Sequence, residues 1–528
     1  MGLTALASVL ALALPAAPVG AAQRPADETL VQTETGVVRG EVTAGYRRFR
    51  AVPFAAAPVG GLRWQPPRPA TGWTGVRDAT RPGPRCPQLP VGASAVQGSE
   101  DCLYLDVATP PAGRGPRPVM VWVHGGSFTQ GSGVGYDAAR LAADGDVVVV
   151  TVNYRLGALG FLGYPGLGSS AGFGLLDQRA ALSWVARNAA AFGGDPRNVT
   201  YFGQSAGSLS GCAHLATPAA AGLFHKVILQ SGACTTPGLS TAAARATGLP
   251  GPATAAGSSI WAPLADSEAT GRKLAEQAGC RDQATALACL RTKPVADLFT
   301  AGKGLVWGPA YGTPVLPVSP DQALRQGRFP RLPTVVGHTR DEARLLVALT
   351  LKRPLTTLEY VVVLGQAFGI NAGKVNSQYP ASRYPSPTIA WATVLTDRFW
   401  SCATHTDRQA LAATAPVFGY EFADPAPPRL YPFPDWLEPG AYHGSELVYL
   451  FGPDAAGLTP PQRQLSAAML RYWARFATTG DPNTGGLPAW PRVTPDRHLT
   501  QTLAPGAGGI APLDGAAAHH CAFWAGLG

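Results

Sequence analysis

Runs of β-branched and other apolar residues recur along this chain of 528 residues. Most runs are continuous rather than alternating with polar residues. Continuous runs are typical of strands that are buried on both faces of a mostly parallel sheet. We therefore predict central strands at 118–123, 146–152, 199–202, 226–230 and 333–336.

Helical patterns lie between several of these strands. The segments 176–187 and 206–215 are the clearest examples. Regular alternation of strand and helix predicts a doubly wound α/β architecture with helices on both faces of the sheet. The stretches 237–304, around Pro380 and 425–434 interrupt the alternation, and we interpret them as insertions or surface loops of one domain.

The first residues have the pattern of a secretory signal peptide. An apolar stretch from Leu3 to Leu14 is followed by two prolines and then by small residues up to Ala22. It is too short to cross a membrane, and no later segment reaches about 18 uninterrupted apolar residues. We predict a signal peptide at 1–22 and one catalytic domain at 23–528, exported to an extracellular or periplasm-type oxidising compartment.

The cysteine content fits such a compartment, because an even number of cysteines suits disulfide pairing. None of them forms a C-x-x-C pair, so the spacing argues against a zinc site or a thioredoxin-like site. Spacing alone does not determine the pairs, although Cys86–Cys102 and Cys280–Cys289 are close enough in sequence to be natural first candidates. The eight cysteines are Cys86, Cys102, Cys212, Cys234, Cys280, Cys289, Cys402 and Cys521.

The formal charge of +9 does not indicate a nucleic-acid partner. Only 14% of the residues are charged, and the sequence contains no Lys/Arg run and no basic stripe with interleaved aromatic residues. Proteins that bind nucleic acids carry such features. We predict no nucleic-acid partner.

Two pentapeptides fit G-x-S-x-G, the pattern of a serine nucleophile on a strand-to-helix turn. They are GSSAG around Ser170 and GQSAG around Ser205. The turn needs a strand before it, a helix after it, and glycines where a Cβ would clash. Ser205 has a predicted strand at 199–202 and a predicted helix at 206–215. Residues 162–168 are rich in Gly and Pro and supply no strand, so we interpret the segment around Ser170 as a flexible connection.

A second motif supports Ser205. Residues 124–131 (HGGSFTQG) follow the predicted strand 118–123 directly and resemble the HGGG-type loop that donates backbone N–H groups to an oxyanion. Consecutive glycines let this backbone approach a substrate carbonyl, and such donors contribute substantially to catalysis of acyl transfer. The two motifs in this order predict acyl transfer to Ser205.

A serine nucleophile also needs a histidine base and an orienting carboxylate, in the order Ser, Asp/Glu, His for this type of site. His443 lies between a proline-rich loop and an apolar run, as expected for a base carried on a loop. Asp341 and Glu342 follow a predicted strand, and their chemistry alone leaves them nearly equal as the acid. Most of the other histidines have the character of surface or packing residues: His214, His225, His405, His498, His519 and His520.

Together these residues resemble the type-B carboxylesterase/cholinesterase family of α/β-hydrolases. Similar segments run through nearly the whole mature chain, from GVVRG at 36–40 to CAFW at 521–524. The most specific are SEDCLYLDV at 99–107 and FGGDPRNVTYFGQSAG at 192–207. The resemblance implies an α/β-hydrolase fold, with a mostly parallel central sheet, helices on both faces, and loop and helical insertions.

The resemblance also implies roles for individual residues. Ser205 would be the nucleophile and His443 the general base and acid. The family's acid is the Glu of a D-E-G segment, which selects Glu342 over Asp341, although Ala343 stands here in place of the glycine. The oxyanion hole would use the backbone N–H groups of Gly125, Gly126 and Ala206.

Disulfides are implied in the same way for Cys86–Cys102, Cys280–Cys289 and Cys402–Cys521. Cys212 and Cys234 have no counterpart in the resemblance. They lie after the nucleophile turn and after the next strand, which leaves a fourth bridge open. The loop between Cys86 and Cys102 lacks the aromatic residue with which cholinesterases bind choline, so we do not expect a choline ester as a specific substrate.

We therefore expect a secreted serine hydrolase that acts on small-molecule carboxylic esters through an acyl-enzyme, with no metal and no cofactor. A lipase, an amidase and a carbamate hydrolase would use the same triad and remain alternatives. A non-catalytic cholinesterase-like binding protein is the alternative from another class. The complete triad and both oxyanion glycines argue against it.

Overall fold

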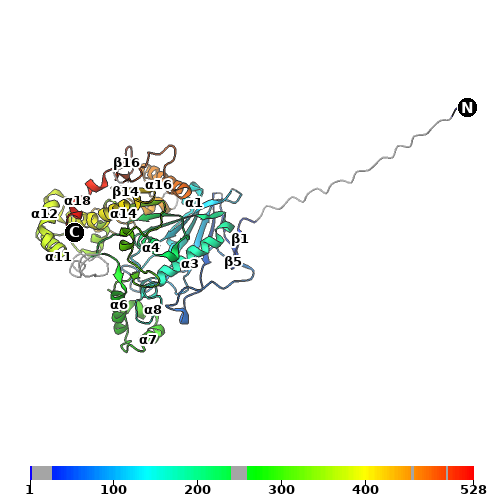
Figure 1. Cartoon of the computed structure of the whole chain (residues 1–528), viewed down its shortest axis with the longest axis horizontal. Coiled ribbons are helices and arrows are strands. Elements are labelled where there is room, and N and C mark those ends of the chain that lie inside the picture. Colours follow the sequence, from blue (N-terminus) through cyan, green and yellow to red (C-terminus); the bar gives the residue numbers. More distant parts are fainter. Residues whose placement is uncertain are drawn as a thin grey trace.

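A large twisted sheet forms the centre of the molecule (Figure 1). The computed structural model describes residues 1–2, 27–43, 45–113, 115–238, 259–452, 457–494 and 497–527. The predicted signal peptide at 1–22 lies, beyond its first two residues, outside this part of the chain. Within it, 11 strands are hydrogen-bonded in the order β16-β15-β14-β13-β10-β9-β7-β8-β6-β4-β3.

The middle of the sheet is parallel and its two ends are antiparallel. All five predicted strands form, and the predicted mostly parallel sheet is confirmed. The parallel strands are β7 (Arg117–Val123), β8 (Val148–Val152), β9 (Gly194–Gln204), β10 (Lys226–Gln230), β13 (Thr334–Thr339), β14 (Val417–Phe422) and β15 (Thr500–Leu503). The end strands are β3 (Glu41–Val42), β4 (Arg47–Pro53), β6 (Tyr104–Thr109) and β16 (Ile510–Leu513).

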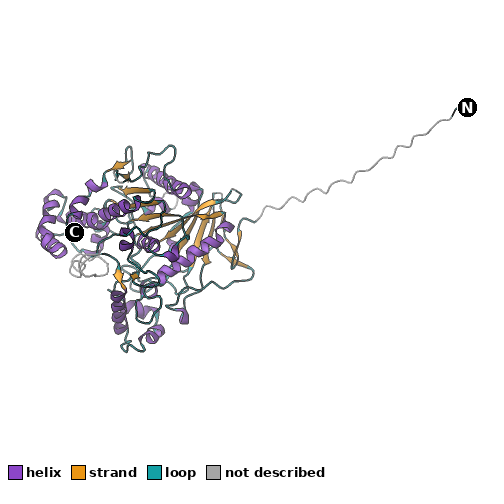
Figure 2. Cartoon of the chain, viewed as in Figure 1, coloured by secondary structure: helices purple, strands orange, loops and turns teal. Residues whose placement is uncertain are grey.

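Helices cover both faces of the sheet (Figure 2). Successive residues of β7 show why its sequence is apolar from 118 to 123: Val121 packs into one hydrophobic core, and its neighbour Trp122 packs into the other. The core around Val121 includes side chains of α3 (Phe173–Asn188) and α4 (Ala206–Leu215). The core around Trp122 includes side chains of α1 (Ala139–Gly145), α15 (Leu447–Phe451) and α16 (Pro460–Thr479).

Two groups of helices extend from this framework (Figure 1). The first belongs to the predicted insertion 237–304, of which residues 239–258 lie outside the described residues; it contains α6 (Leu264–Gln277), α7 (Ala286–Thr292) and α8 (Val295–Ala301). The second has a hydrophobic core of its own and contains α10 (Ala343–Thr350), α11 (Thr357–Phe368), α12 (Ala372–Gln378), α13 (Pro387–Thr396), α14 (Cys402–Ala412) and α18 (Cys521–Ala525). The proline-rich stretch 425–434 is a loop, as expected.

Four disulfides join the eight cysteines in the pairs Cys86–Cys102, Cys212–Cys234, Cys280–Cys289 and Cys402–Cys521. The bridge that the sequence left open, Cys212–Cys234, connects α4 to the segment that follows β10. Helix α4, which begins directly after Ser205, is therefore covalently tied to the segment that follows β10.

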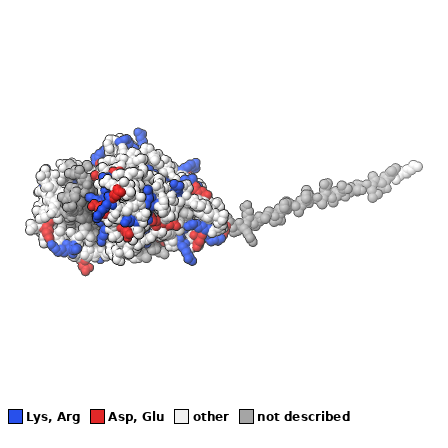
Figure 3. All heavy atoms as spheres, turned by 90° about the horizontal axis from the view of Figure 1, so that it is seen from below, with Lys and Arg blue, Asp and Glu red and all other residues white. Residues whose placement is uncertain are grey.

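Charged side chains of both signs are interspersed on the face of the molecule seen in Figure 3. None of the described helices combines the length and the apolar character that crossing a lipid bilayer would require.

Candidate active site

Ser205 lies at the junction between β9 and α4. Its backbone has φ 55° and ψ −120°, a region that residues other than glycine rarely adopt and that costs on the order of 1–3 kcal/mol. Two glycines permit the close approach of backbone at this junction. A Cβ at Gly207 would overlap the carbonyl oxygen of Val123, and a Cβ at Gly203 would lie 2.6 Å from the carbonyl carbon of Gly207. The GQSAG segment therefore adopts a sharp strand-to-helix turn.

The GSSAG segment has a different environment. Ser170 lies in a turn between α2 (Gly157–Phe161) and α3, and no strand enters it. The Ser170 hydroxyl accepts a hydrogen bond from the Tyr164 N–H (2.8 Å) and donates one to the Tyr164 carbonyl (3.2 Å). Ser170 is only 4% exposed. The segment is a loop, as expected, but it is a closed, buried turn rather than a flexible connection.

Glu342 and His443 form a direct pair. Glu342 directly precedes α10, and its Oε2 lies 2.5 Å from Nδ1 of His443. The other carboxylate oxygen accepts the backbone N–H of Thr339 at 2.8 Å. Glu342 is completely buried. Ala343, which stands where the family has glycine, is the first residue of α10 and is buried without distortion of the helix.

The contact between Glu342 and His443 shifts the pKa of both side chains. Burial raises the pKa of Glu342, but the charge and the hydrogen bond of His443, with the Thr339 N–H, outweigh it and hold that pKa below its ordinary value. Burial lowers the pKa of His443, but the Glu342 carboxylate outweighs it and raises that pKa above its ordinary value. A carboxylate that orients an imidazole and stabilises its protonated form has these two effects.

Asp341, the other candidate acid, contacts the backbone of Ala441 and the side chain of Arg344 instead of His443. One of its carboxylate oxygens accepts the Ala441 N–H at 2.9 Å, and the other lies 2.7 Å from the guanidinium of Arg344. The Asp341 N–H also donates to the Ala441 carbonyl at 2.9 Å. Asp341 thereby holds the segment that leads into His443.

The three N–H groups expected in an oxyanion hole come from two segments. Gly125 and Gly126 follow β7, and Ala206 is the first residue of α4. Within the residues that the structure describes, the N–H groups of these three residues have no recorded hydrogen-bond partner. The loop is fixed through other atoms: the Tyr154 hydroxyl donates to the His124 carbonyl (2.8 Å), and the Gly157 N–H donates to the Phe128 carbonyl (2.7 Å).

The structure reveals a polar neighbour of His443 that our sequence reasoning missed. The side-chain amide of Gln204 lies 3.1 Å from His443 Nε2. In the described chain, the two ring nitrogens of His443 contact Gln204 and Glu342, and no hydrogen bond joins His443 to the Ser205 hydroxyl. Gln204 is the second letter of GQSAG, so the motif contained it without indicating its role.

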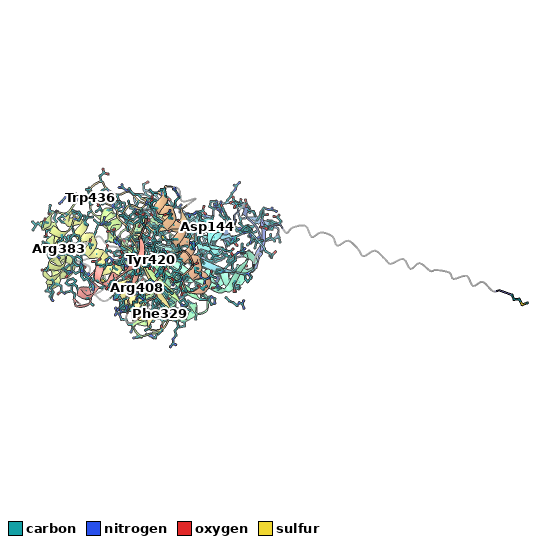
Figure 4. The ribbon with its side chains drawn as sticks, turned by 90° about the horizontal axis from the view of Figure 1, so that it is seen from above. Asp144, Phe329, Arg383, Arg408, Tyr420 and Trp436 are labelled. Atoms are coloured by element: carbon teal, nitrogen blue, oxygen red, sulfur yellow. A yellow bond between two sulfur atoms is a disulfide. The ribbon has the colours of Figure 1, made fainter. Side chains whose placement is uncertain are left out.

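A second residue that sequence reasoning missed is the acid Glu446, which lies completely buried three residues after His443. Its Oε1 accepts a hydrogen bond from Gln230 Nε2 (3.2 Å), and the Gln230 Oε1 accepts one from the Trp473 indole (3.2 Å). Burial, with a contribution from the Glu342 charge, raises the pKa of Glu446 to about 7. Tyr420, which Figure 4 shows near the centre of the molecule, interacts electrostatically with Glu446 and Glu342.

Within the described residues, two clusters have the composition of metal sites, but their ligand atoms already have other partners. The thiols of Cys212 and Cys234, near Asp407, are joined in a disulfide. In the cluster of His338, Glu421 and His519, the two ring nitrogens of His519 each lie 2.6 Å from a carboxylate oxygen, one of Asp397 and one of Glu421. This second cluster is therefore an ion-pair network.

With this geometry in place, we compared the chain with known proteins. Residues 27–524 match the model of a family described as the carboxylesterase family. The chain belongs to the carboxylesterase family. Our prediction of a carboxylic ester hydrolase is thereby confirmed, as is the predicted α/β-hydrolase fold.

Individual carboxylesterases align along most of their length. A para-nitrobenzyl esterase of Bacillus subtilis is 36% identical over 90% of this chain and 94% of the relative. A fumonisin B1 esterase of Sphingopyxis macrogoltabida is 35% identical over 93% of this chain and 89% of the relative. A solved structure of PNB esterase has a TM-score of 0.76 and 31% identity, and the match covers 94% of this chain and 100% of that chain.

Proposed function

We propose that this carboxylesterase is exported and hydrolyses small-molecule esters with Ser205 as nucleophile, His443 as general base and acid, and Glu342 as the orienting carboxylate. The contact that carries the proposal is the 2.5 Å pair between Glu342 and His443. Two further features support it: the strained backbone of Ser205 and the unpartnered N–H groups of Gly125, Gly126 and Ala206 in the described chain.

The reaction follows from these positions. Ser205 attacks the ester carbonyl while His443 Nε2 takes its proton, and the resulting oxyanion is stabilised by the backbone N–H groups. His443 then gives the proton to the departing alcohol, which leaves an acyl group on Ser205. A water molecule attacks this acyl-enzyme with the same assistance from His443, and the acid is released.

Replacement of the nucleophile is the direct test. Ser205→Ala should abolish hydrolysis of p-nitrophenyl acetate, because Ser205 is the only described residue with a hydroxyl at the turn between β9 and α4. Diethyl p-nitrophenyl phosphate should label the wild type once per chain, at the peptide that contains Ser205. Turnover retained by a clean Ser205→Ala preparation would contradict the triad, and an unlabelled, inactive wild type would favour the non-catalytic binding protein.

Ser170→Ala is the matched control, because it removes the serine of the other G-x-S-x-G segment. It should leave kcat and KM unchanged. It should lower stability by about 1 kcal/mol, because it removes the buried hydrogen bonds with Tyr164.

The substrate class can be narrowed by assay. Two relatives are named for para-nitrobenzyl and fumonisin B1 esters, so p-nitrobenzyl esters are suitable first substrates. A series of p-nitrophenyl esters of increasing acyl length separates an esterase from a lipase. The matching p-nitroanilide and carbamate identify an amidase or a carbamate hydrolase. We expect the highest kcat/KM with a short-chain ester.

Export is supported by the four disulfides and by the apolar pattern of the first 22 residues. Expression of the full chain in a secretion-competent host should yield extracellular protein that lacks these residues. N-terminal sequencing of the product would measure this, and an uncleaved intracellular product would contradict it.

A further inference from the structure

Gln204 directly precedes the nucleophile, and its side chain is buried between the two catalytic loops. It is 4% exposed. On one side, a Cβ added to Gly125 would lie 2.6 Å from Gln204 Oε1. On the other side, Gln204 Nε2 lies 3.1 Å from His443 Nε2, and a Cβ added to Gly444 would lie 3.6 Å from it. The amide therefore fills the space between the oxyanion-hole loop and the loop that carries His443.

The direction of the Gln204–His443 hydrogen bond follows from the opposite side of the imidazole ring. His443 Nδ1 lies 2.5 Å from Glu342 Oε2. An ionised carboxylate only accepts hydrogen bonds, so the proton of the neutral ring is on Nδ1. Nε2 then has the lone pair, and the amide N–H of Gln204 donates to it. This is the same lone pair that must take the proton of Ser205.

Gln204 and Ser205 therefore compete for one acceptor. A ring nitrogen has a single lone pair in the plane of the ring, so a full hydrogen bond from Ser205 requires the amide to withdraw. The exchange gives up one buried hydrogen bond, whose net strength corresponds to about threefold to tenfold in an equilibrium constant.

We propose that Gln204 is a positioning residue that holds His443 in a resting state, and that withdrawal of its amide from Nε2 is a separate step before Ser205 attacks. The inference rests on the proposed triad. In this proposal an ester carbonyl bound at the oxyanion hole displaces the amide, which lies against Gly125. Binding of substrate and release of the base are thereby coupled.

The groups that face His443 come from several elements. Glu342 lies at the start of α10, Glu446 directly precedes α15, and Tyr420 on β14 interacts with both carboxyl groups. The ring of Trp400 lies 5.9 Å from the imidazole ring. Burial lowers the pKa of His443, whereas Glu342 and Glu446 raise it. A hydrogen bond donated to Nε2 favours the neutral ring and so acts in the same direction as burial.

Two variants test the proposal. Gln204→Met keeps the length of the side chain and removes the N–H donor. It should increase the rate at which diethyl p-nitrophenyl phosphate labels Ser205 by about threefold to tenfold at high pH. It should also raise the pKa of the acid limb of that rate by about 0.5 to 1. Gln204→Glu, which is nearly isosteric, converts the donor into an anionic acceptor, and it should raise the same pKa by about 1 or more.

Gln178→Met is the matched control. Gln178 is also buried, and its amide oxygen lies 2.8 Å from Nε2 of another buried histidine, His214, outside the site. This control should leave the labelling rate and its pH dependence unchanged. A folded Gln204→Met protein that is labelled no faster than wild type would overturn the proposal. An unmoved acid limb in Gln204→Glu would do the same, and this variant keeps the test decisive if methionine disturbs the packing.

The downfield imidazole N–H resonance of His443, identified by its loss in His443→Gln, gives a readout that needs no turnover. The midpoint of the pH titration of this resonance should lie at a higher pH in both Gln204 variants than in the wild type. If the wild type hydrolyses no ester while this titration still moves, the proposed function fails and the role of Gln204 stands. If esters are hydrolysed and the titration does not move, the triad stands and the role of Gln204 fails.

Discussion

His443 shows how a single hydrogen bond can determine the chemistry of a side chain. In the proposed triad, Glu342 holds the proton of the neutral ring on Nδ1 and leaves Nε2 as the base. The sequence pointed to His443 by its position on a loop. Chemistry alone left Asp341 and Glu342 nearly equal, and only the family resemblance selected Glu342. These two neighbours have the same chemistry and differ only in what they meet in the fold: Arg344 and the Ala441 N–H for Asp341, and His443 for Glu342.

This pair leads to a prediction for pH dependence. The base must be neutral to accept a proton, so activity is lost as pH falls through the pKa of His443. Because Glu342 raises that pKa, the acid limb of kcat/KM should lie above pH 6.5. Glu342→Gln should move the limb to lower pH and reduce kcat by about a thousandfold or more.

The measurement is kcat/KM for p-nitrophenyl acetate between pH 5 and 9. Asp341→Asn is the control, because the Asp341 carboxylate contacts Arg344 and the Ala441 N–H rather than His443. It should leave the limb in place. If Asp341→Asn moves the acid limb of kcat/KM and Glu342→Gln does not, Asp341 rather than Glu342 would be the orienting carboxylate.

At the scale of elements, the central strands were predictable and the end strands were not. Residues 148–152 are buried on both faces, and their sequence is continuously β-branched, with four valines and one threonine. β4 at 47–53 contains three arginines and pairs near the end of the sheet, so its sequence lacks that signal. β9 begins five residues before the predicted 199. Its first residues, 194–198, lack the apolar run from which the strand was predicted, and most of them are partly exposed. Such boundaries depend on neighbours that the local pattern does not contain.

The Cys212–Cys234 bridge gives a prediction at this scale. It closes a separation of 22 residues between α4 and the segment after β10. Replacement of both cysteines by alanine should lower the free energy of unfolding by about 3 kcal/mol, because the unfolded chain regains the freedom of that loop. Urea unfolding of the purified proteins measures the difference.

Cys280 and Cys289, which are separated by 9 residues, provide the control. Their double alanine variant should lose less stability, because a shorter loop restricts the unfolded chain less. An unchanged urea midpoint without Cys212 and Cys234 would show that this bridge does not stabilise the folded chain.

At the scale of the whole molecule, His519 joins segments that are far apart in sequence. Its ring nitrogens donate to Asp397 and Glu421, and Glu421 also accepts from Arg340 (2.7 Å). The next residue but one, Cys521, is bonded to Cys402. The C-terminal helices are therefore held by both an ion-pair network and a disulfide. Sequence reasoning classed His519 among the surface or packing residues, because its partners lie about 100 residues away along the chain.

This network predicts a loss of stability at alkaline pH. Burial lowers the pKa of His519, but its two carboxylate partners outweigh burial and raise it to about 10. Because this value lies above the ordinary 6.5, the stabilisation is fully present below pH 6.5 and is lost as pH rises towards 10. His519→Gln should lower stability at pH 6 by about 3 kcal/mol or more.

Thermal unfolding of wild type and His519→Gln between pH 6 and 10 measures this, and the two curves should converge at the alkaline end. His498→Gln is the control, because the His498 ring contacts His405 rather than a carboxylate. A constant difference across the pH range would contradict a charged His519.

The backbone of Ser205 carries a final consequence for evolution. Its φ of 55° suits glycine better than serine, so the folded chain would be more stable with glycine in place of this proposed nucleophile. Selection for stability alone would therefore favour loss of this serine, whereas selection for the proposed hydrolysis would keep it. A laboratory programme that screens this protein for heat resistance without an activity screen would follow the same path.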